Sequence, residues 1–301
     1  MDDGGDRMNL SSTTVTWRGL TFYGRRGLGP FTFSELDGWE ELPPARHDGS
    51  DVRPQAHGRF DAPVWADERT VTLTGFCSSA TQRDAVLAQL GDVMTWPSGR
   101  GLAEDLVITQ AGRTLTGNAR LTRYKATLGR GWAVGYFPYA VQWVCSDPMR
   151  YGAPVPVTTG FPQLVGGLEY DLYTDGTLDT GFLEYGAAST TGRIVVANPG
   201  NADAWAQYEI LGPVPVEGFD ILRVGTGDRL RFAGGVSAGS RLVIDSATGV
   251  VVIDGYADRS GLLTVRDWFP VPAKGSVEIA FVPLGAYSTA QLTATVSPGF
   301  W

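Results

Sequence analysis

The sequence contains few of the residues on which most enzymes and metal proteins depend. Its 301 residues include two histidines, His47 and His57, and two cysteines, Cys77 and Cys145. The cysteines do not form a metal-ligand spacing with the histidines, so exposed loop histidines are the favoured interpretation. Each cysteine ends an apolar stretch, which favours buried free thiols over a disulfide. A Ser/His/Asp triad is not supported with so few histidines.

Familiar catalytic and membrane patterns are also missing. The sequence has no His-Glu-x-x-His, Cys-x-x-Cys or Gly-x-Ser-x-Gly motif. No apolar run approaches the roughly 20 residues that span a bilayer, and the acidic start, residues 1–6, does not resemble a secretory signal. We therefore expect a protein made in a cytoplasm that is not an enzyme and has no membrane span, cofactor or metal.

Two features that resemble reactive sites have simpler interpretations. The segment Gly24–Pro30 resembles a phosphate loop, but no Gly-Lys-Ser/Thr follows it, so we interpret it as a turn. Asp175 with Asp179, and Asp254 with Asp258, are candidate carboxylate pairs for a glycosidase. Both pairs lie in glycine-rich segments, where aspartate favours turn geometry. Calcium binding by Asp254 and Asp258 is a weaker alternative.

Charge is distributed unevenly along the chain. The net charge of −8 argues against general nucleic-acid binding. Residues 1–152 hold 16 Lys and Arg against 17 Asp and Glu, whereas residues 153–301 hold 8 against 15. The stretch from Leu106 to Ser146 contains no acidic residue. It contains five basic residues: Arg113, Arg120, Arg123, Lys125 and Arg130.

The length and composition predict two β-rich domains. A chain of 301 residues accommodates two cores, and 40 glycines with 18 prolines favour strands and turns. Residues 136–145 alternate as a long strand with one buried face, and Asp147-Pro148 then stops that strand. We expect an N-terminal domain over 1–152, a linker with inserted turns over 153–191, and a C-terminal β-sandwich domain over 192–301.

The first domain is expected to combine strands with one helix. Ser79 is the expected N-cap of the helix, with Gln82 as its capping-box partner, and Trp96-Pro97 ends it. Its apolar stripe is Val86, Leu87, Leu90, Val93 and Met94. The polar, acidic segment 37–68 is expected to be irregular. Predicted strands cover 14–23, 31–36, 69–77, 106–109, 113–117, 120–127 and 133–145, with hairpin turns at 110–112 and 128–131.

The second domain shows short strands at the regular spacing of a sandwich. Predicted strands cover 194–198, 204–211, 219–224, 229–232, 275–281 and 290–296, with a hairpin over 240–255 that turns at 246–249. Several aromatic residues could stack on sugars, although packing roles are favoured for most of them. These residues are Tyr170, Tyr173, Tyr185, Tyr256, Tyr287 and Trp301.

The order of these features resembles siphophage distal tail proteins, which form the baseplate ring at the tip of long non-contractile tails. A strand followed by Asp147-Pro148 and Tyr151-Gly152 resembles the end of the family's N-terminal domain, and the element order matches over most of 14–152. The doubled Val-Ile-Asp of 240–255 resembles the family's C-terminal hairpin, with Ser246 where threonine is commoner. The match near Trp268 is approximate, because Phe269 is inserted there.

This resemblance implies a mainly β fold, with an N-terminal β-sandwich that has one helix and a long β-hairpin, plus a C-terminal galectin-like β-sandwich. It implies a homo-hexamer in the virion, at the tail tip or baseplate, that joins the tail tube protein to the tail-associated hub protein. The C-terminal sandwiches would carry peripheral or receptor-binding parts. Two alternatives stay open: a carbohydrate-binding receptor-recognition tail protein that contacts host-surface glycan through its C-terminal domain, and a polysaccharide-degrading enzyme.

The charge pattern suggests how such a ring would close. The long hairpin carries four basic residues, and residues 35–68, which in the resembled family wrap part of the ring, are rich in acids. Head-to-tail contacts that close by rotation give rings, and complementary charge fixes their register. Pairing within one domain, or simple exposure to solvent, is the alternative. The candidate interprotomer residues are Arg120, Arg123, Lys125 and Arg130.

Overall fold

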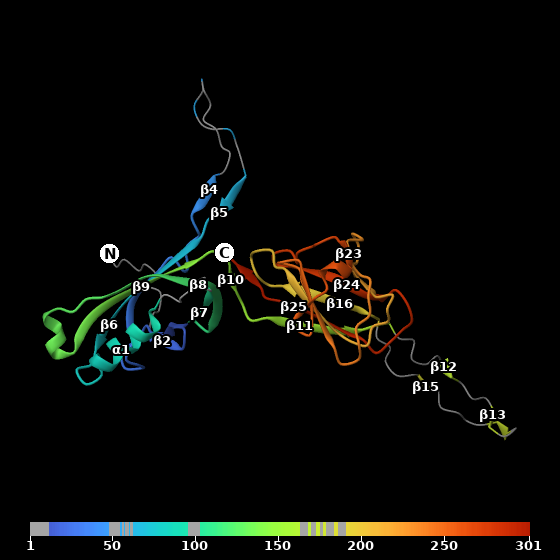
Figure 1. Cartoon of the computed structure of the whole chain (residues 1–301), viewed down its shortest axis with the longest axis horizontal. Coiled ribbons are helices and arrows are strands. Elements are labelled where there is room, and N and C mark those ends of the chain that lie inside the picture. The colour runs from blue at the N-terminus through green and yellow to red at the C-terminus, as the bar shows by residue number, and fades with distance from the viewer. Residues whose placement is uncertain are drawn as a thin grey trace. The chain divides into compact units, whose positions relative to one another are not determined.

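The computed structural model describes residues 12–47, 63–95, 103–162 and 191–301, together with residues 55, 57, 60, 168–169, 173–174, 177–178 and 184–185. The chain divides into two compact units, residues 1–153 with 300–301 and residues 154–299 (Figure 1). The chain therefore passes between the units twice. Both units are built mainly from strands, so the predicted mainly β fold class is confirmed.

The first unit is a sheet that closes on itself. Its strand order is β26-β10-β8-β7-β1-β2-β3-β6-β9, and β9 pairs back onto β8. The first half of β8 pairs with β7 and its second half with β9, so this strand closes the sheet. The bounds are β1 Thr14–Trp17, β2 Leu20–Tyr23, β3 Thr32–Asp37, β6 Arg69–Ser78, β7 Glu104–Gln110, β8 Arg113–Ala126, β9 Tyr136–Cys145, β10 Arg150–Tyr151 and β26 Gly299–Phe300.

Aromatic side chains dominate the core of this unit. The ring centroids of Trp17 and Trp143 lie 5.8 Å apart, and those of Phe22 and Tyr139 lie 5.9 Å apart. The Tyr139 hydroxyl donates a hydrogen bond to the Thr32 carbonyl, and burial raises the pKa of Tyr139. Both cysteines are buried and free, as predicted.

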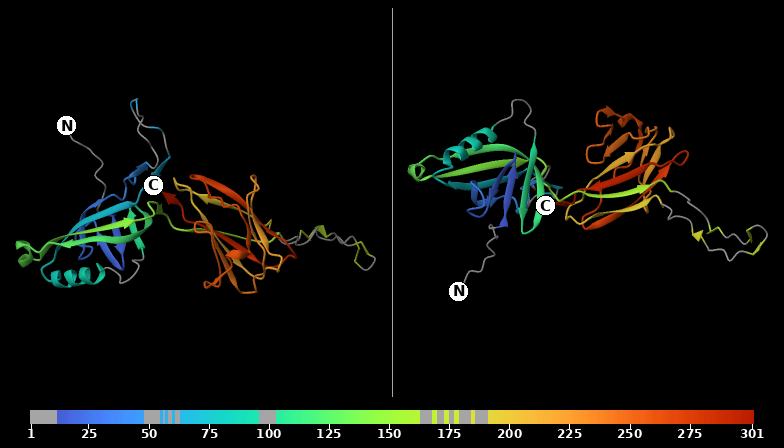
Figure 2. Two further views of the ribbon diagram at one scale, coloured as in Figure 1. Left: turned by 45° about the horizontal axis from the view of Figure 1, so that its top comes forward. Right: turned by 90° about the horizontal axis from the view of Figure 1, so that it is seen from below.

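The helix α1, Arg83–Val93, starts later than the sequence predicted. Gln82 occupies the N-cap position and makes no side-chain capping bond. Ser79 Oγ lies 3.3 Å from Thr81 Oγ1 instead, so the predicted capping box is wrong. The predicted apolar stripe is confirmed: its side chains are buried or packed against the core of the first unit. Figure 2 shows α1 and the tip of the β8–β9 hairpin at the same side of this unit in both views.

Several predicted strands have different boundaries. The strand expected over 14–23 is the hairpin β1–β2, which turns at Arg18 and Gly19 with positive φ angles of 48° and 76°. The strands expected over 113–117 and 120–127 are the single strand β8. The connection after β8 contains a 3-10 turn, Arg130–Val134, so β9 begins at Tyr136 instead of Ala133. Within the segment expected to be irregular, β4 Ala45–His47 pairs with β5 Val64–Ala66 as a two-stranded arm.

The second unit is a two-sheet β-sandwich around one apolar core, as predicted. The sheet orders are β11-β25-β17-β20-β21-β22 and β16-β24-β18-β19-β23. The bounds are β11 Val155–Gly160, β16 Arg193–Asn198, β17 Ala206–Leu211, β18 Phe219–Arg223, β19 Arg229–Phe232, β20 Arg241–Asp245, β21 Val250–Ile253, β22 Ala257–Asp258, β23 Leu263–Arg266, β24 Gly275–Pro283 and β25 Gln291–Val296. Two short pairs precede β16: β12 Leu168–Glu169 with β15 Glu184–Tyr185, and β13 Tyr173–Thr174 with β14 Thr177–Leu178.

Strand β11 lies in the segment that the sequence assigned to a linker. It pairs with β25 over six residues, from Val155 opposite Val296 to Gly160 opposite Gln291. Pro156 lies within it, and proline is confined to edge strands because it cannot donate to a ladder on both sides. β11 is the edge strand of its sheet, so the proline is tolerated there.

Candidate contact surfaces

The outer face of the β8–β9 hairpin carries a group of exposed positive charges. Arg120, Arg123 and Lys125 lie on β8, Arg130 lies in the connection that follows, and all four are exposed. Arg120 donates a hydrogen bond of 3.1 Å to Ser146 Oγ. The other three have no hydrogen bond or ion pair with the part of the chain that the structure describes. We call Arg120, Arg123 and Lys125 with their strand neighbours the basic face.

A β-bulge determines which side chains reach the basic face. Before the bulge, odd-numbered residues of β8 face the core, as the partly buried Leu121 does. The register shifts between Leu121 and Arg123, which leaves Thr122 as the extra residue. After the bulge, Tyr124 packs against the core and Lys125 is exposed. If Thr122 occupied an ordinary position in the ladder, the strand period of two would direct Arg123 and Lys125 inward.

The strands beside β8 add small polar side chains to this face. Thr72 on β6 lies opposite Gln142 on β9, and Gln142 Nε2 donates to Thr72 Oγ1 at 3.3 Å. Thr70 and Thr74 flank Thr72 in the same outward row. The sequences of β6, β8 and β9 contain no aspartate or glutamate. The basic face is therefore suited to an acidic partner.

The arm formed by β4 and β5 exposes apolar side chains. Leu42 is 77% exposed, Val64 is 55% exposed and Trp65 is 59% exposed. A two-stranded sheet is marginally stable alone in water, and large exposed apolar side chains that cluster mark interaction sites. Asp67 and Glu68 follow β5 and are both exposed. The arm is therefore a second candidate contact element, apolar and acidic.

Two buried arginines hold the root of this arm. Arg69 is 1% exposed and donates through Nη1 to three carbonyl oxygens within residues 38–41, and through Nε to the Pro148 carbonyl at 2.8 Å. Arg150 forms an ion pair of 2.9 Å with Glu40. Burial, followed by the nearby positive charge of Arg150, lowers the pKa of Arg69. The pair thus connects the arm to the Asp-Pro turn that ends β9.

The burial of Arg69 could have been predicted from its position in the alternating pattern of β6, although arginine is usually exposed. Arg69 is in phase with Val71 and Leu73, and all three face the core of the first unit. A charged residue at an inward position of a strand indicates a buried polar partner. No comparable periodic signal marks Arg150, because β10 spans only two residues.

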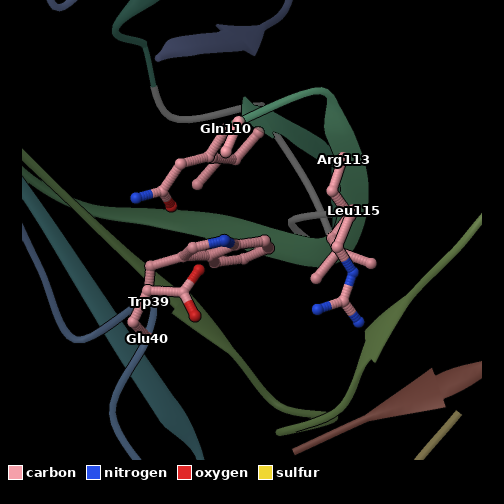
Figure 3. Close-up of a pocket in the computed structure, with 7 residues that line it drawn as sticks. Trp39, Glu40, Gln110, Arg113 and Leu115 are labelled. Atoms are coloured by element: carbon pink, nitrogen blue, oxygen red, sulfur yellow. The ribbon is translucent and has the colours of Figure 1, made fainter. Parts of the chain in front are cut away.

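A cavity of about 510 Å³ lies beside the root of the arm. Figure 3 shows the Trp39 indole between the side chains of Gln110 and Glu40, with Arg113 and Leu115 at the other side. Glu40 is the only carboxylate among the described residues that line the cavity. The Arg113 guanidinium lies 3.9 Å from the centroid of the Phe300 ring. This lining does not supply the two carboxyl groups that glycoside hydrolysis needs.

The remaining candidates that the structure describes do not form a shared site. Asp254 Oδ1 accepts a hydrogen bond from the Arg241 amide, and Asp258 Oδ1 accepts one from the Ser260 amide, as the turn interpretation requires. His57 is exposed. Six candidates lie outside the residues or side chains that the structure describes: Asp175, Asp179, Tyr170 and the side chains of His47, Tyr173 and Tyr185. In the described ranges, no group of three or more His, Cys, Asp or Glu side chains could hold a metal ion, and no helix has the length and apolar character to span a bilayer.

The described residues thus define a class: a protein of two β-rich units with two candidate contact surfaces, the basic face and the arm. No protein-family model and no curated protein matches the sequence. Among solved structures, its fold is similar to that of the phage SPP1 Dit protein, described as a paradigm of the hub adsorption apparatus in phages that infect Gram-positive bacteria. The TM-score is 0.64 and the sequence identity 13%, over 96% of this chain and 99% of the SPP1 chain.

Two structures of the phage P2 baseplate in its activated conformation, with calcium and with strontium, show weaker likeness. Their TM-scores are 0.48 and 0.47 at 12% and 11% identity, and each covers 94% of this chain and 97% of the other. At such low identity these likenesses concern the fold. The resemblance to distal tail proteins that the sequence suggested is confirmed at this level.

Proposed function

We propose that this chain is a structural virion protein of the phage tail tip, which forms a hexameric ring that joins the tail tube protein to the baseplate hub protein and carries peripheral or receptor-binding parts. The observation that supports the proposal most is the fold likeness to the SPP1 Dit protein, which extends over 96% of this chain. A structural, non-enzymatic role is suggested by the hub protein to which the fold is similar.

In this proposal the basic face of one protomer receives the arm of the next protomer. The basic face has no carboxylate on its three strands, and Arg123 and Lys125 have no ion pair with the described residues. The arm supplies the opposite charge and the exposed Trp65. Because the two surfaces lie on different parts of the same chain, their contact is head-to-tail, and such contacts give rings when the rotation closes.

The oligomeric state of the full-length protein tests this proposal. We expect a hollow ring with sixfold symmetry in negative-stain electron micrographs, and a mass of six chains by light scattering after size-exclusion chromatography at low salt. Retention of a monomer or trimer on a column of host glycan would support receptor recognition instead. A closed ring of another symmetry would contradict the hexamer while leaving the tail-tip role open.

A further inference from the structure

One end of the second unit collects exposed loops that are distant in the sequence. We define the loop end as residues 211–218, 254–256 and 284–291. Leu211 pairs with Gln291 at the ends of β17 and β25, and it also pairs with Arg241 on β20. The Leu284 amide donates to the Gly218 carbonyl at 3.0 Å, and the Asp254 amide donates to the Arg241 carbonyl at 2.8 Å. These contacts place all three segments at the same end of the sandwich.

Apolar and aromatic side chains are unusually exposed at the loop end. Tyr256 is 83% exposed, Val216 is 79% exposed and Tyr287 is 69% exposed. Leu211 and Leu284 are each 37% exposed. Clustered exposed apolar residues mark interaction sites, and tyrosine is enriched where proteins bind one another. The structure therefore places at the same end of the sandwich two tyrosines, Tyr256 and Tyr287, that are distant in the sequence.

The charge at the loop end is negative. Arg193 and Arg241, on strands that end near it, each form an ion pair with a glutamate, at 3.2 Å to Glu278 and 3.3 Å to Glu209. The loop end itself contains no lysine or arginine. Its two carboxylates, Glu217 and Asp254, are exposed and have no cationic partner among the described residues. A partner for this surface should therefore carry positive charge around apolar groups.

We propose that the loop end is a docking surface for a lysine- or arginine-bearing polypeptide segment of another protein. The exposed aliphatic side chains of Val216 and Leu284 beside the tyrosines favour a polypeptide over a sugar. Sugars stack on aromatic faces and need polar groups for their hydroxyls, whereas aliphatic groups bury against other apolar side chains. None of the residues belongs to the first unit, so the proposal is independent of how the ring closes.

Peptide binding to the full-length protein tests the proposal. The probe is a fluorescein-labelled peptide, Lys-Leu-Lys-Tyr-Lys-Leu-Lys, followed by fluorescence polarisation at low salt. Its matched control carries glutamate in place of each lysine. We expect the lysine peptide to bind and the glutamate peptide not to bind. The double change Tyr256→Ala with Tyr287→Ala should weaken binding about tenfold. The double change Glu217→Gln with Asp254→Asn should weaken it several-fold and reduce its salt dependence.

A matched charge change separates this site from general attraction to an acidic protein. Asp228→Asn with Asp267→Asn removes the same charge at the opposite end of the sandwich, where the Asp267 amide bonds the Arg229 carbonyl. We expect this variant to bind like the wild type. The proposal is overturned if the wild type does not bind the lysine peptide, if the control variant weakens binding equally, or if the tyrosine variant binds normally. Tyrosine-dependent binding of an N-acetylglucosamine tetramer without peptide binding would assign the surface to glycan. A change in oligomer size in these variants would assign it to a second copy.

Discussion

Arg69 and Arg150 donate hydrogen bonds to the same acceptor, the carbonyl oxygen of Trp39, at 2.9 and 2.8 Å. Arg69 is the first residue of β6, and Arg150 is the first residue of β10, just beyond Asp147-Pro148. The carbonyls near Trp39 lie where the chain leaves the sheet for the arm, so they lack a strand partner on that side. The two guanidinium groups supply the donors that buried main-chain oxygens require.

Replacing Arg69 should therefore destabilise the first unit strongly. Arg69→Met keeps much of the side-chain volume but leaves several buried carbonyl oxygens without a donor. We expect a loss of about 3–5 kcal/mol in the free energy of unfolding, the range for breaking a buried charged network. Guanidinium chloride unfolding followed by circular dichroism measures it. Arg120→Met, at an exposed position, should change stability by no more than about 0.5 kcal/mol. Equal effects of the two changes would contradict the role given to Arg69.

The sequence was informative wherever one periodicity continued without interruption. Strict alternation predicted β6 and β9, and the helical stripe around Leu90 predicted the buried face of α1. The sequence was misleading where a local irregularity interrupted the pattern. The bulge at Thr122 inverts the alternation of β8. Pro156 made residues 155–160 resemble a linker, although they form the edge strand β11.

The candidate contact residues were predictable in part. An acid-free stretch indicated that the long hairpin carries a basic surface, and the structure places Arg120, Arg123 and Lys125 on the outside of β8. The sequence could not indicate that Tyr256 and Tyr287 lie at one end of the sandwich, because their positions depend on strand pairing between distant segments. Nor could it identify the partner of either surface, since complementarity is a property of two surfaces.

Deleting Thr122 should preserve the basic face. The deletion removes the extra residue of the bulge, so a regular period of two keeps Tyr124 on the core side of β8 and Arg123 and Lys125 outside. We expect a small loss of stability, about 0.5–1 kcal/mol, for the exposed hydrogen bond from Thr122 to the Gln142 carbonyl. Deleting Tyr124 instead would bring Arg123 or Lys125 to the inward position that Tyr124 occupies. Burying an unpaired charge is costly, and we expect a loss of more than about 3 kcal/mol or a failure to fold. Similar melting temperatures for the two variants would show that the bulge does not set the register.

Charge reversal on the basic face should prevent ring assembly. Exposed pairs are each worth only about 0–1 kcal/mol, so a single change should matter little. Arg123→Glu with Lys125→Glu places like charges opposite one another at every interface. We expect a folded variant that elutes as a monomer at low salt and partly reassembles when added salt screens the repulsion. Arg259→Glu with Lys274→Glu, two exposed positions in the second unit, is the matched control and should leave the ring intact. Full-sized rings of the Arg123 and Lys125 variant at low salt would show that the basic face is not the charged contact between protomers.

Alkaline pH should destabilise the first unit through Cys145. The thiol is 1% exposed, and burial raises its pKa to about 11, although the charge of Arg69 opposes the shift. The unfolded chain releases this proton near the ordinary thiol pKa of about 8.5. The contribution of the protonated Cys145 thiol to the free energy of unfolding is therefore complete below that pH and is lost progressively as the pH rises toward 11. The slope is at most about 1.4 kcal/mol per pH unit for one group.

Denaturant unfolding at several pH values between about 8.5 and 10 measures this dependence. Cys145→Ala should make the free energy of unfolding depend less on pH in that window, which lies below the pH at which the buried tyrosines lose their protons in the unfolded chain. Val141→Ala, on the same strand and fully buried, should lower stability through a cavity while keeping the slope. An unchanged slope in Cys145→Ala would show that another group accounts for any alkaline loss.

The second unit should fold by itself only when β11 is included. A fragment of residues 154–299 retains both sheets, and Val157 on β11 packs against the core. A fragment of residues 192–299, which begins where the sequence placed the domain boundary, loses β11 and exposes the whole edge of β25, a template for association with other chains. We expect the longer fragment to be monomeric, rich in strands and cooperative in thermal unfolding. The shorter fragment should melt at a lower temperature or aggregate. Equal melting temperatures of the two fragments would show that the folding unit begins at residue 192. If the longer fragment were molten while the full-length chain is folded, the second unit would depend on the first for its stability.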